Sequence, residues 1–212
     1  MKILNKLKWV AAFAIVAASG TANATPVVDY SGSGNPGVAM EITDTGVFQT
    51  AGAAALSSFL NWSSLLPLVD GVGKIRISGV QLINNAVTQF NSVISQETSG
   101  GLIEALDNAN NVLLSATFTS GVVSLAANGA GSQFTVGLAT FGGLYASYFV
   151  PTSATHTVSL INWSPVVLNA QTIGKSAGYG NGLIAGTQVP EPTTMFLLGS
   201  GILGAALKRK RA

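Results

Sequence analysis

Short runs of alternating apolar and polar residues, separated by turn-forming residues, fill the middle of this 212-residue chain. In GVAMEITDTG, Met40 and Ile42 are two residues apart, and in VGKIRISGVQL so are Ile75 and Ile77. Residues two apart share one face of a β-strand, whereas an amphipathic helix needs a sustained period of about 3.6 residues, which this part of the sequence lacks. Strands at intervals of about eight to twelve residues predict an all-β fold, either an antiparallel β-sandwich or a jelly-roll-like fold.

The clearest pair of strands is a β-hairpin near the centre of the chain. Leu102–Leu106 and Val112–Phe118 are strand-like, and Asp107–Asn111 between them are mostly turn formers. Further strands are predicted in SQFTVGLATFGGLYASYFV and ATHTVSLINWSPVVL. The segment TAGAAALSSFLNWSSLLPLV is ambiguous; its alanine and leucine content favours a turn of helix near Gly52–Leu60.

Apolar positions in the predicted strands define an expected core. Burying each such side chain stabilises the folded state by about 1.5–3 kcal/mol, so together they offset a large share of the chain entropy lost on folding. We expect the core shared by two sheets to contain Ile75, Ile77, Leu113, Phe118, Phe134, Val136, Val158 and Leu160.

The N-terminal sequence MKILNKLKWVAAFAIVAASGTANA has the three parts of a secretory signal peptide. Three lysines precede the apolar stretch Trp9–Ala18, and the small residues Ala22 and Ala24 follow it with one residue between them. This pattern predicts export through the Sec translocon and cleavage by signal peptidase after Ala24.

The C-terminal sequence VPEPTTMFLLGSGILGAALKRKRA contains a second apolar segment. The run Thr193–Leu207 carries no charge, and at about 1.5 Å per residue a helix over it reaches roughly 22 Å, short of a hydrocarbon core of about 30 Å. Such a helix can span the bilayer if basic side chains snorkel into the head groups, so we expect a short transmembrane helix. A basic stop-transfer cluster follows it: Lys208, Arg209, Lys210 and Arg211.

The distribution of charge predicts a topology. Of the ten Lys and Arg residues, three precede the first apolar run and four follow the last, so both tips are expected on the cytoplasmic side and the middle is translocated. Between Thr25 and Val189 there are three basic and seven acidic residues, a net charge of 3 − 7 = −4. Nucleic acid is therefore not expected as a partner, because its binding needs a basic patch.

Val189, Pro190, Glu191 and Pro192, followed by a short glycine-containing apolar run and a basic cluster, resemble the PEP-CTERM sorting signal of Gram-negative bacteria. The same type of tail is also labelled an ice-binding-protein C-terminal motif. The resemblance covers about the last 24 residues. It implies recognition by an exosortase, an integral-membrane cysteine protease that cuts near Pro-Glu-Pro. The chain would then be anchored transiently in the inner membrane, and reach the cell surface or the medium after processing. An ordinary tail anchor is the alternative.

Three segments are therefore expected: a signal peptide at 1–24, a secreted β-rich passenger domain at 25–188 and the sorting signal at 189–212. The passenger has the length of one domain and contains no cysteine. Its last part, Gly174–Gln188, is rich in glycine and is expected to be a pliable tether in front of the sorting signal.

We expect no catalytic site in the passenger. His156 is the single histidine, expected at the surface or at a strand edge, and the one Gly-x-Ser-x-Gly sequence, at residues 174–178, lies in a glycine-rich stretch and not in a strand–turn–helix elbow. One histidine without cysteine does not suit zinc. A glycosidase would need two facing carboxylates, and the candidate glutamates Glu41, Glu97 and Glu104 lie in no recognisable motif. We therefore expect no catalytic residue, metal or cofactor.

Calcium is the strongest of the weak metal candidates, because loop oxygens are available. Asp107–Asn111 is not an EF-hand loop, however, since Ala109 occupies the third position. Left-handed backbone geometry is a sufficient explanation for Asp and Asn in such a turn.

Two classes of function remain. The resemblance favours a non-enzymatic surface or matrix protein, because PEP-CTERM systems are associated with exopolysaccharide and with biofilm or floc formation. The alternative is a secreted hydrolase or a carbohydrate-binding protein that acts on extracellular polysaccharide. Acidic residues clustered around a cleft would favour the second class, and a flat or convex face of Ser, Thr and Asn would count against it.

Overall fold

The computed structural model describes residues 25–32, 40–64, 66–85, 87–89, 93–126, 132–163, 166–168 and 171–189. The chain divides into two units, of which one comprises residues 24–187 and the other residues 1–23 and 188–212. The predicted signal peptide, with Ala22 and Ala24, and the tail from Pro190 onward lie outside the described residues. Within the described ranges, no helix has the length and apolarity needed to cross a membrane.

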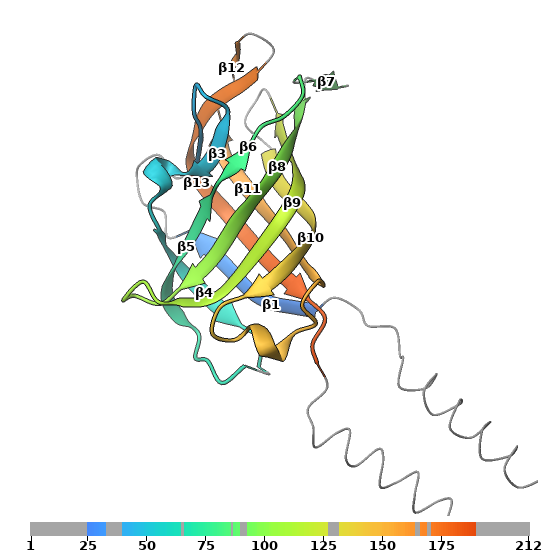
Figure 1. Cartoon of the computed structure of the whole chain (residues 1–212). Helices are drawn as coiled ribbons and strands as arrows, with labels where there is room; N and C mark the ends of the chain where they lie inside the picture. Colours follow the sequence, from blue (N-terminus) through green and yellow to red (C-terminus); the bar gives the residue numbers. More distant parts are fainter. Residues whose placement is uncertain are drawn as a thin grey trace, which may run out of the picture. The chain divides into compact units, whose positions relative to one another are not determined.

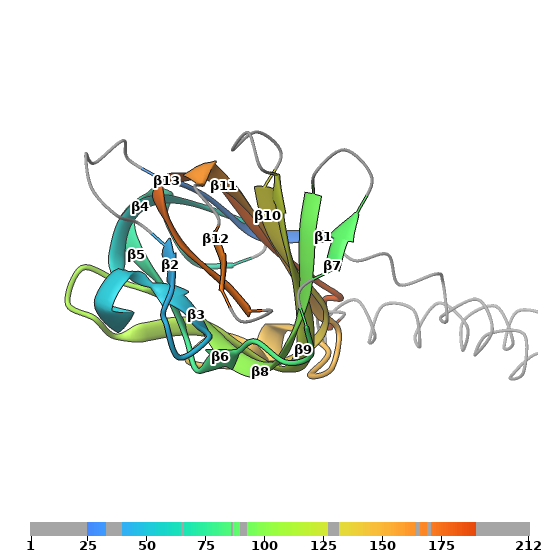
Figure 2. The same cartoon turned by 90° about the horizontal axis from the view of Figure 1, so that it is seen from above.

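The unit of residues 24–187 contains a closed, eight-stranded antiparallel β-barrel (Figures 1 and 2). Its strands follow one another around the barrel in chain order, and the last pairs with the first at Thr25 and Gly186. We call the end of the barrel with these two residues the terminal end, and the opposite end the distal end. The strands are β1 (Thr25–Gly32), β4 (Leu56–Trp62), β5 (Gly71–Ser78), β8 (Val93–Leu106), β9 (Val112–Ala126), β10 (Ser132–Gly142), β11 (Ala154–Trp163) and β13 (Gln171–Gly186).

The all-β prediction is confirmed, but the predicted sandwich or jelly-roll arrangement is wrong. One sheet closes on itself through the pairing of β1 with β13, so there are no two separate sheets facing each other. The alternation in the sequence reports only that each strand has one buried face, which is equally true of a strand in a sandwich and in a barrel.

A second set of short strands completes the wall at the distal end. β2 (Met40–Ile42) pairs with β13, β3 (Val47–Thr50) with β2, and β6 (Val80–Gln81) with β3. Leu82 then bridges to Thr98 of β8. The long strands β8 to β13 thus form one side of the barrel, while the other side is built by β1, β4 and β5 at the terminal end and by β2, β3 and β6 at the distal end.

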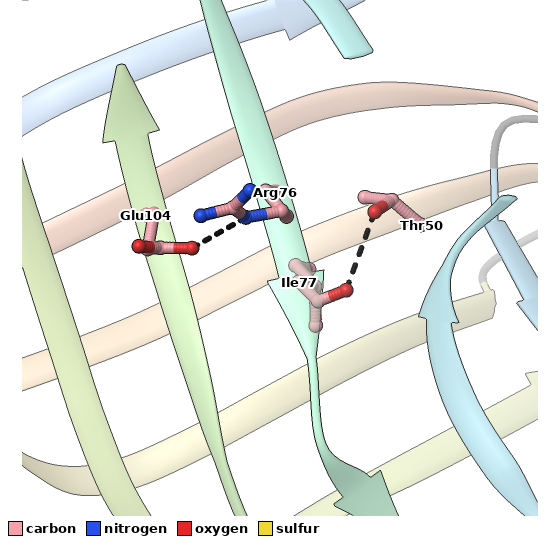
Figure 3. A network of polar contacts seen from close by, with 4 residues as sticks. All are labelled: Thr50, Arg76, Ile77 and Glu104. Atoms are coloured by element: carbon pink, nitrogen blue, oxygen red, sulfur yellow. Dashed lines mark hydrogen bonds and ion pairs between the residues drawn. The ribbon is translucent and has the colours of Figure 1, made fainter. Parts of the chain in front are cut away.

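A buried hydrogen bond joins these two parts of the wall. The hydroxyl of Thr50, at the end of β3, donates to the carbonyl oxygen of Ile77 on β5 at 3.3 Å (Figure 3). Two hairpins extend the distal end, where β7 (Val87–Gln89) pairs with β8 and β12 (Val166–Leu168) pairs with β13 (Figure 1).

Two local predictions are wrong. The glycine-rich segment Gly174–Gln188 is not a tether, because most of it belongs to β13, which pairs with β11 on one side and with β1 and β2 on the other. The expected helical turn near Gly52–Leu60 is a 3-10 turn, Ala51–Ala53, followed by β4. Burial of alternate side chains in β4 outweighs the weak helical preference of alanine and leucine.

The barrel interior is filled by apolar side chains, with Phe134 at the centre of an aromatic cluster. Its ring centroid lies 4.7 Å from that of Phe48, and 5.8 Å from those of Phe118 and His156. The predicted hairpin is confirmed, and so is the burial of seven of the eight predicted core residues. Leu113 is the exception: it is only partly buried and packs against the margin of the core, whereas its neighbour Leu114 points inward.

The strand β10 bends half-way along its length. Val136 and Ala139 both face the interior, so the two residues between them, Gly137 and Leu138, both face outward. The pairing of β10 with β11 shifts register at the same place. Because regular strands alternate strictly, such a double outward step marks a β-bulge. It leaves Leu138 72% exposed on the outer wall.

Inward-facing glycines make room for the large side chains of the core. A Cβ atom added at Gly182 would run into the ring of Tyr30, and one added at Gly186 would run into the ring of Phe141. At Gly121 it would lie 3.1 Å from the ring of Phe134. Large rings therefore occupy the space that side chains at these positions would need, and the interior is a packed core.

Gly182→Ala should destabilise the barrel, because its methyl group would overlap the buried ring of Tyr30. We expect a loss of roughly 1–3 kcal/mol in the free energy of unfolding, as for other overpacked cores. The control is Gly137→Ala, where an added Cβ meets no atom within 4 Å. Urea unfolding of the two variants measures the difference, and equal unfolding midpoints would contradict the packed interior.

Candidate functional site

His156 lies inside the barrel and not at its surface. It is on β11, only 1% of it is exposed, and its Nε2 atom is hydrogen bonded to the Tyr30 hydroxyl at 2.6 Å. The prediction of a surface or strand-edge histidine is therefore wrong. The alternation of β11 places residues 154, 156, 158 and 160 on the inner face. In the sequence ATHTVSL, the valine and the leucine indicated this inner face, but the polar histidine in the same set made its own burial hard to predict.

Burial holds His156 in its neutral form. Desolvation lowers the pKa of its imidazole from 6.5 to about 3. Its Nδ1 atom and the hydroxyl oxygen of Thr98 are both buried without a hydrogen-bond partner among the described residues. A catalytic histidine must contact its substrate, whereas this imidazole is enclosed by Tyr30, Phe134 and the strands that carry them.

The three candidate glutamates each bind a different local partner. Glu41 accepts hydrogen bonds from the side chain of Gln49 at 3.0 Å and from the backbone nitrogen of Gly52 at 2.9 Å. Glu97 accepts one from Asn84 at 2.7 Å. Glu97 and Glu104 lie on the same strand, seven positions apart, which corresponds to about 23 Å. The carboxyl groups of a glycosidase pair are about 5–9.5 Å apart, so these two do not form one.

The third glutamate forms an ion pair across neighbouring strands. The Nε atom of Arg76 on β5 donates to Oε2 of Glu104 on β8 at 2.6 Å (Figure 3). The Glu104 side chain is 7% exposed and the Arg76 side chain 36%. The hydrogen bond to Glu104 raises the pKa of Arg76 above its usual value. The pair therefore links two strands of the wall, as a directly opposed pair of unlike charges does in a sheet.

The Asp107–Asn111 turn satisfies its own polar groups. The Asp107 carboxylate accepts hydrogen bonds from the backbone nitrogen of Asn111 at 2.8 Å and from its side chain at 2.7 Å. These bonds lower the pKa of Asp107. Asn110 has φ 68°, which confirms the left-handed geometry expected for the turn. Within the described residues, no cluster of three or more His, Cys, Asp or Glu side chains could hold a metal ion.

The outer wall of strands β8 to β11 is rich in serine and threonine. Most of these side chains alternate with buried residues and face outward, whereas Thr98 and Ser132 are buried. We call this surface the hydroxyl face. Its residues are Ser95, Ser99, Ser115, Thr117, Thr119, Ser120, Ser124, Gln133, Thr135, Thr140, Thr155, Thr157 and Ser159.

Residues of the hydroxyl face lie in rows across the strands. Gln133 of β10 pairs with Ser124 on one side and with Ser159 on the other. Thr140 pairs with Thr117 of β9. Because neighbouring strands are about 4.8 Å apart, these rows place hydroxyl and amide groups at regular intervals over a convex wall.

Most of the hydroxyl face lies on strands without formal charge. From Asn108 to Gly174 the sequence contains no Asp, Glu, Lys or Arg, so β9, β10 and β11 carry none, whereas on β8 the exposed Glu97 lies between Ser95 and Ser99. Of the basic residues in the described strands, Lys74 and Arg76 are on β5 and Lys175 is on β13. The strand pattern and the uncharged run could both be read from the sequence, but their combination on one surface depends on the order of strands around the barrel.

The described residues include only one of the predicted sorting residues. Val189 is 46% exposed, whereas Pro190, Glu191, Pro192 and the basic cluster Lys208–Arg211 lie outside them. The last residue of the barrel unit, Thr187, is held by the β10–β11 loop: its backbone nitrogen donates to the Ser153 hydroxyl at 2.8 Å, and its carbonyl oxygen accepts from Val150 at 2.7 Å.

The buried histidine predicts a loss of stability in mild acid. The unfolded chain binds a proton near pH 6.5, but the folded barrel does so only near pH 3. The free energy of unfolding should fall by about 1.4 kcal/mol for each pH unit below the unfolded pKa, down to the folded pKa. Urea unfolding between about pH 6.5 and 5 isolates this effect, because carboxylates titrate mainly below that window. In His156→Gln the slope in this window should disappear; an unchanged slope would contradict the assignment.

The comparison with known proteins concerns the tail. Residues 188–211 match the family model of the PEP-CTERM protein-sorting motif, which confirms the resemblance of this segment. No curated protein and no solved structure matches the chain. The chain carries a PEP-CTERM protein-sorting motif, which marks it for export and for sorting to the cell surface by an exosortase.

Proposed function

We propose that the protein is a non-enzymatic component of the cell surface or extracellular matrix, and that its hydroxyl face binds neutral exopolysaccharide. The observation that carries the proposal is the wall of Ser, Thr and Gln side chains, most of them on the uncharged strands β9, β10 and β11. Hydroxyl and amide groups both donate and accept hydrogen bonds, as sugar hydroxyls do, and their regular rows suit a repeating polymer. A role in biofilm or floc formation follows from binding of this kind.

The alternative function, hydrolysis of extracellular polysaccharide, has less support in the barrel. The histidine is enclosed in the core, and the candidate glutamates are bound to separate partners. A convex wall also lacks the concave shape in which hydrolytic carboxylates usually surround a substrate. The hydroxyl face therefore favours attachment over turnover.

The barrel boundaries are compatible with removal of both ends of the chain. β1 begins at Thr25, directly after the predicted signal peptidase site, and the barrel unit ends at Thr187, before Pro190. Cleavage at these two places would leave every strand of the barrel in the mature protein. The apolar run Thr193–Leu207 would act as a transient membrane anchor until the exosortase cuts.

Binding to polysaccharide should depend on paired hydroxyls. In the double variant Thr117→Val/Thr140→Val, two opposed and exposed hydroxyls are replaced by methyl groups of similar shape. Each lost hydrogen bond is worth about 1 kcal/mol, so binding should weaken roughly tenfold to a hundredfold. Co-sedimentation with cellulose and affinity electrophoresis in dextran, both neutral, measure this; alginate serves as the acidic comparison.

The matched control is Thr45→Val/Thr152→Val, which removes two exposed threonine hydroxyls outside the hydroxyl face. It should bind the neutral polymers as the unmodified chain does. Binding should also be insensitive to salt, because no charge pairs carry it. Equal binding by the two double variants, or tight binding to alginate alone, would rule out the hydroxyl face as the binding surface.

Processing should remove both ends of the chain. The protein recovered from the cell surface or medium should begin at Thr25 and end near Pro192, which intact-mass measurement decides. Glu191→Ala should leave the chain in the inner membrane, because it alters the motif that the exosortase recognises. Glu97→Ala, which changes another glutamate, should be processed normally. Surface protein that still carries Lys208–Arg211 would instead indicate an ordinary tail anchor.

A further inference from the structure

Both segments predicted to enter the membrane leave the barrel at its terminal end. Thr25, which follows the signal peptide, is the strand partner of Gly186. Thr187 is the last residue of the barrel unit, and two hydrogen bonds to the β10–β11 loop hold its backbone in place. The terminal end is therefore where the folded barrel is connected to the sorting tail.

The connection to the tail is short. Only residues 188–192 separate Thr187 from the apolar run that begins at Thr193. Fully extended, this stretch reaches roughly 20 Å. The head-group region on each side of a bilayer is about 5–8 Å thick. If the apolar run is in the membrane, the terminal end of the barrel must lie close to the lipid surface.

Two of the three loops at the terminal end carry exposed apolar side chains, whereas the third, the Asp107–Asn111 turn, is polar. Val69, in the β4–β5 loop, is 90% exposed, and Leu144, in the β10–β11 loop, is 69% exposed. Tyr148 and Val150 of the β10–β11 loop are also exposed. We call these four residues the apolar rim. Both loops bond to the strand ends at this side of the barrel: Ser63 to Val27, and Val150 to Thr187.

The charge and chemistry of the rim suit the membrane interface. The β10–β11 loop, residues 143–153, contains no charged residue. Asp70, the one charged residue of the β4–β5 loop, accepts a hydrogen bond from the backbone nitrogen of Trp62 at 2.6 Å. Tyr145 and Tyr148 lie with their ring centroids 6.0 Å apart. Tyrosine is enriched where lipid meets water, because its ring is apolar and its hydroxyl is polar.

We propose that the apolar rim rests in the interfacial region of the membrane for as long as the sorting tail is attached. This inference rests on the proposed function, in which the apolar run Thr193–Leu207 enters the bilayer. In this arrangement the barrel stands with its distal hairpins away from the membrane. The Pro-Glu-Pro segment then lies at the lipid surface, where a membrane-embedded protease can reach it. Release of the tail also frees the rim, because four side chains alone bind a bilayer only weakly.

Single-cysteine labelling of the full chain tests the proposal, since the sequence contains no cysteine. Leu144→Cys places an environment-sensitive fluorophore on the rim. Leu138→Cys is the matched control: it replaces the same residue type with similar exposure, 72% against 69%, but on the outer wall half-way along β10. Leu198→Cys places the label in the apolar run of the tail. The labelled chains are reconstituted into vesicles of phosphatidylethanolamine and phosphatidylglycerol, with and without brominated acyl chains.

The labels at positions 144 and 198 should shift their emission to the blue and lose most of it to the brominated lipid, while the label at Leu138→Cys should be unaffected. If position 198 is quenched and position 144 behaves like position 138, the rim does not contact lipid and this inference is overturned, whereas the sorting proposal stands. If position 198 is not quenched, the tail does not enter the bilayer. That outcome overturns the membrane step of the proposed function and this inference with it.

Discussion

The interior of this barrel is a packed core because large aromatic rings fit against inward-facing glycines. Eight strands enclose a space that side chains can just fill. Here Tyr30 lies against Gly182 and Phe141 against Gly186, so the rings occupy the space that a side chain at either position would need. Neutral His156 is part of the same packing. With its interior packed in this way, the barrel presents its outer wall, its end loops and its hairpins for recognition.

Much of the fold was predictable from the sequence, because strand alternation is a local signal. The central hairpin and the burial of Ile75, Ile77 and five other core positions follow from it. Closure of the sheet does not, because the pairing of β1 with β13 joins residues that lie far apart in the chain and leaves no local pattern. The composition of β13 is rich in glycine and therefore resembled that of a linker. Two of its glycines instead make room for aromatic rings on other strands. Leu113 was predicted in the core in place of Leu114, because either of two adjacent leucines can be the one that faces inward.

The candidate surface was only partly predictable. A face of Ser, Thr and Asn was named from the sequence only as a feature that would separate the two function classes, and the serines and threonines of the hydroxyl face do share one wall. Their rows depend on strand register, as in the pairing of Thr117 with Thr140, which composition cannot give. His156 was misplaced because a polar residue in an alternating strand resembles an outward-facing one. Its burial became visible only with its partner Tyr30, which is 126 positions away in the chain.

The pairing of Thr25 with Gly186 has a consequence for the timing of folding. β1 can pair early with β4, but its second partner, β13, is the last strand of the barrel, and contacts between such distant segments form slowly because a long loop must close first. Until β13 is available, the chain can form only an open sheet with an unpaired edge, a state prone to association with other chains. In the proposed sorting route, a tail held in the membrane would keep each chain apart from its neighbours while the ring closes.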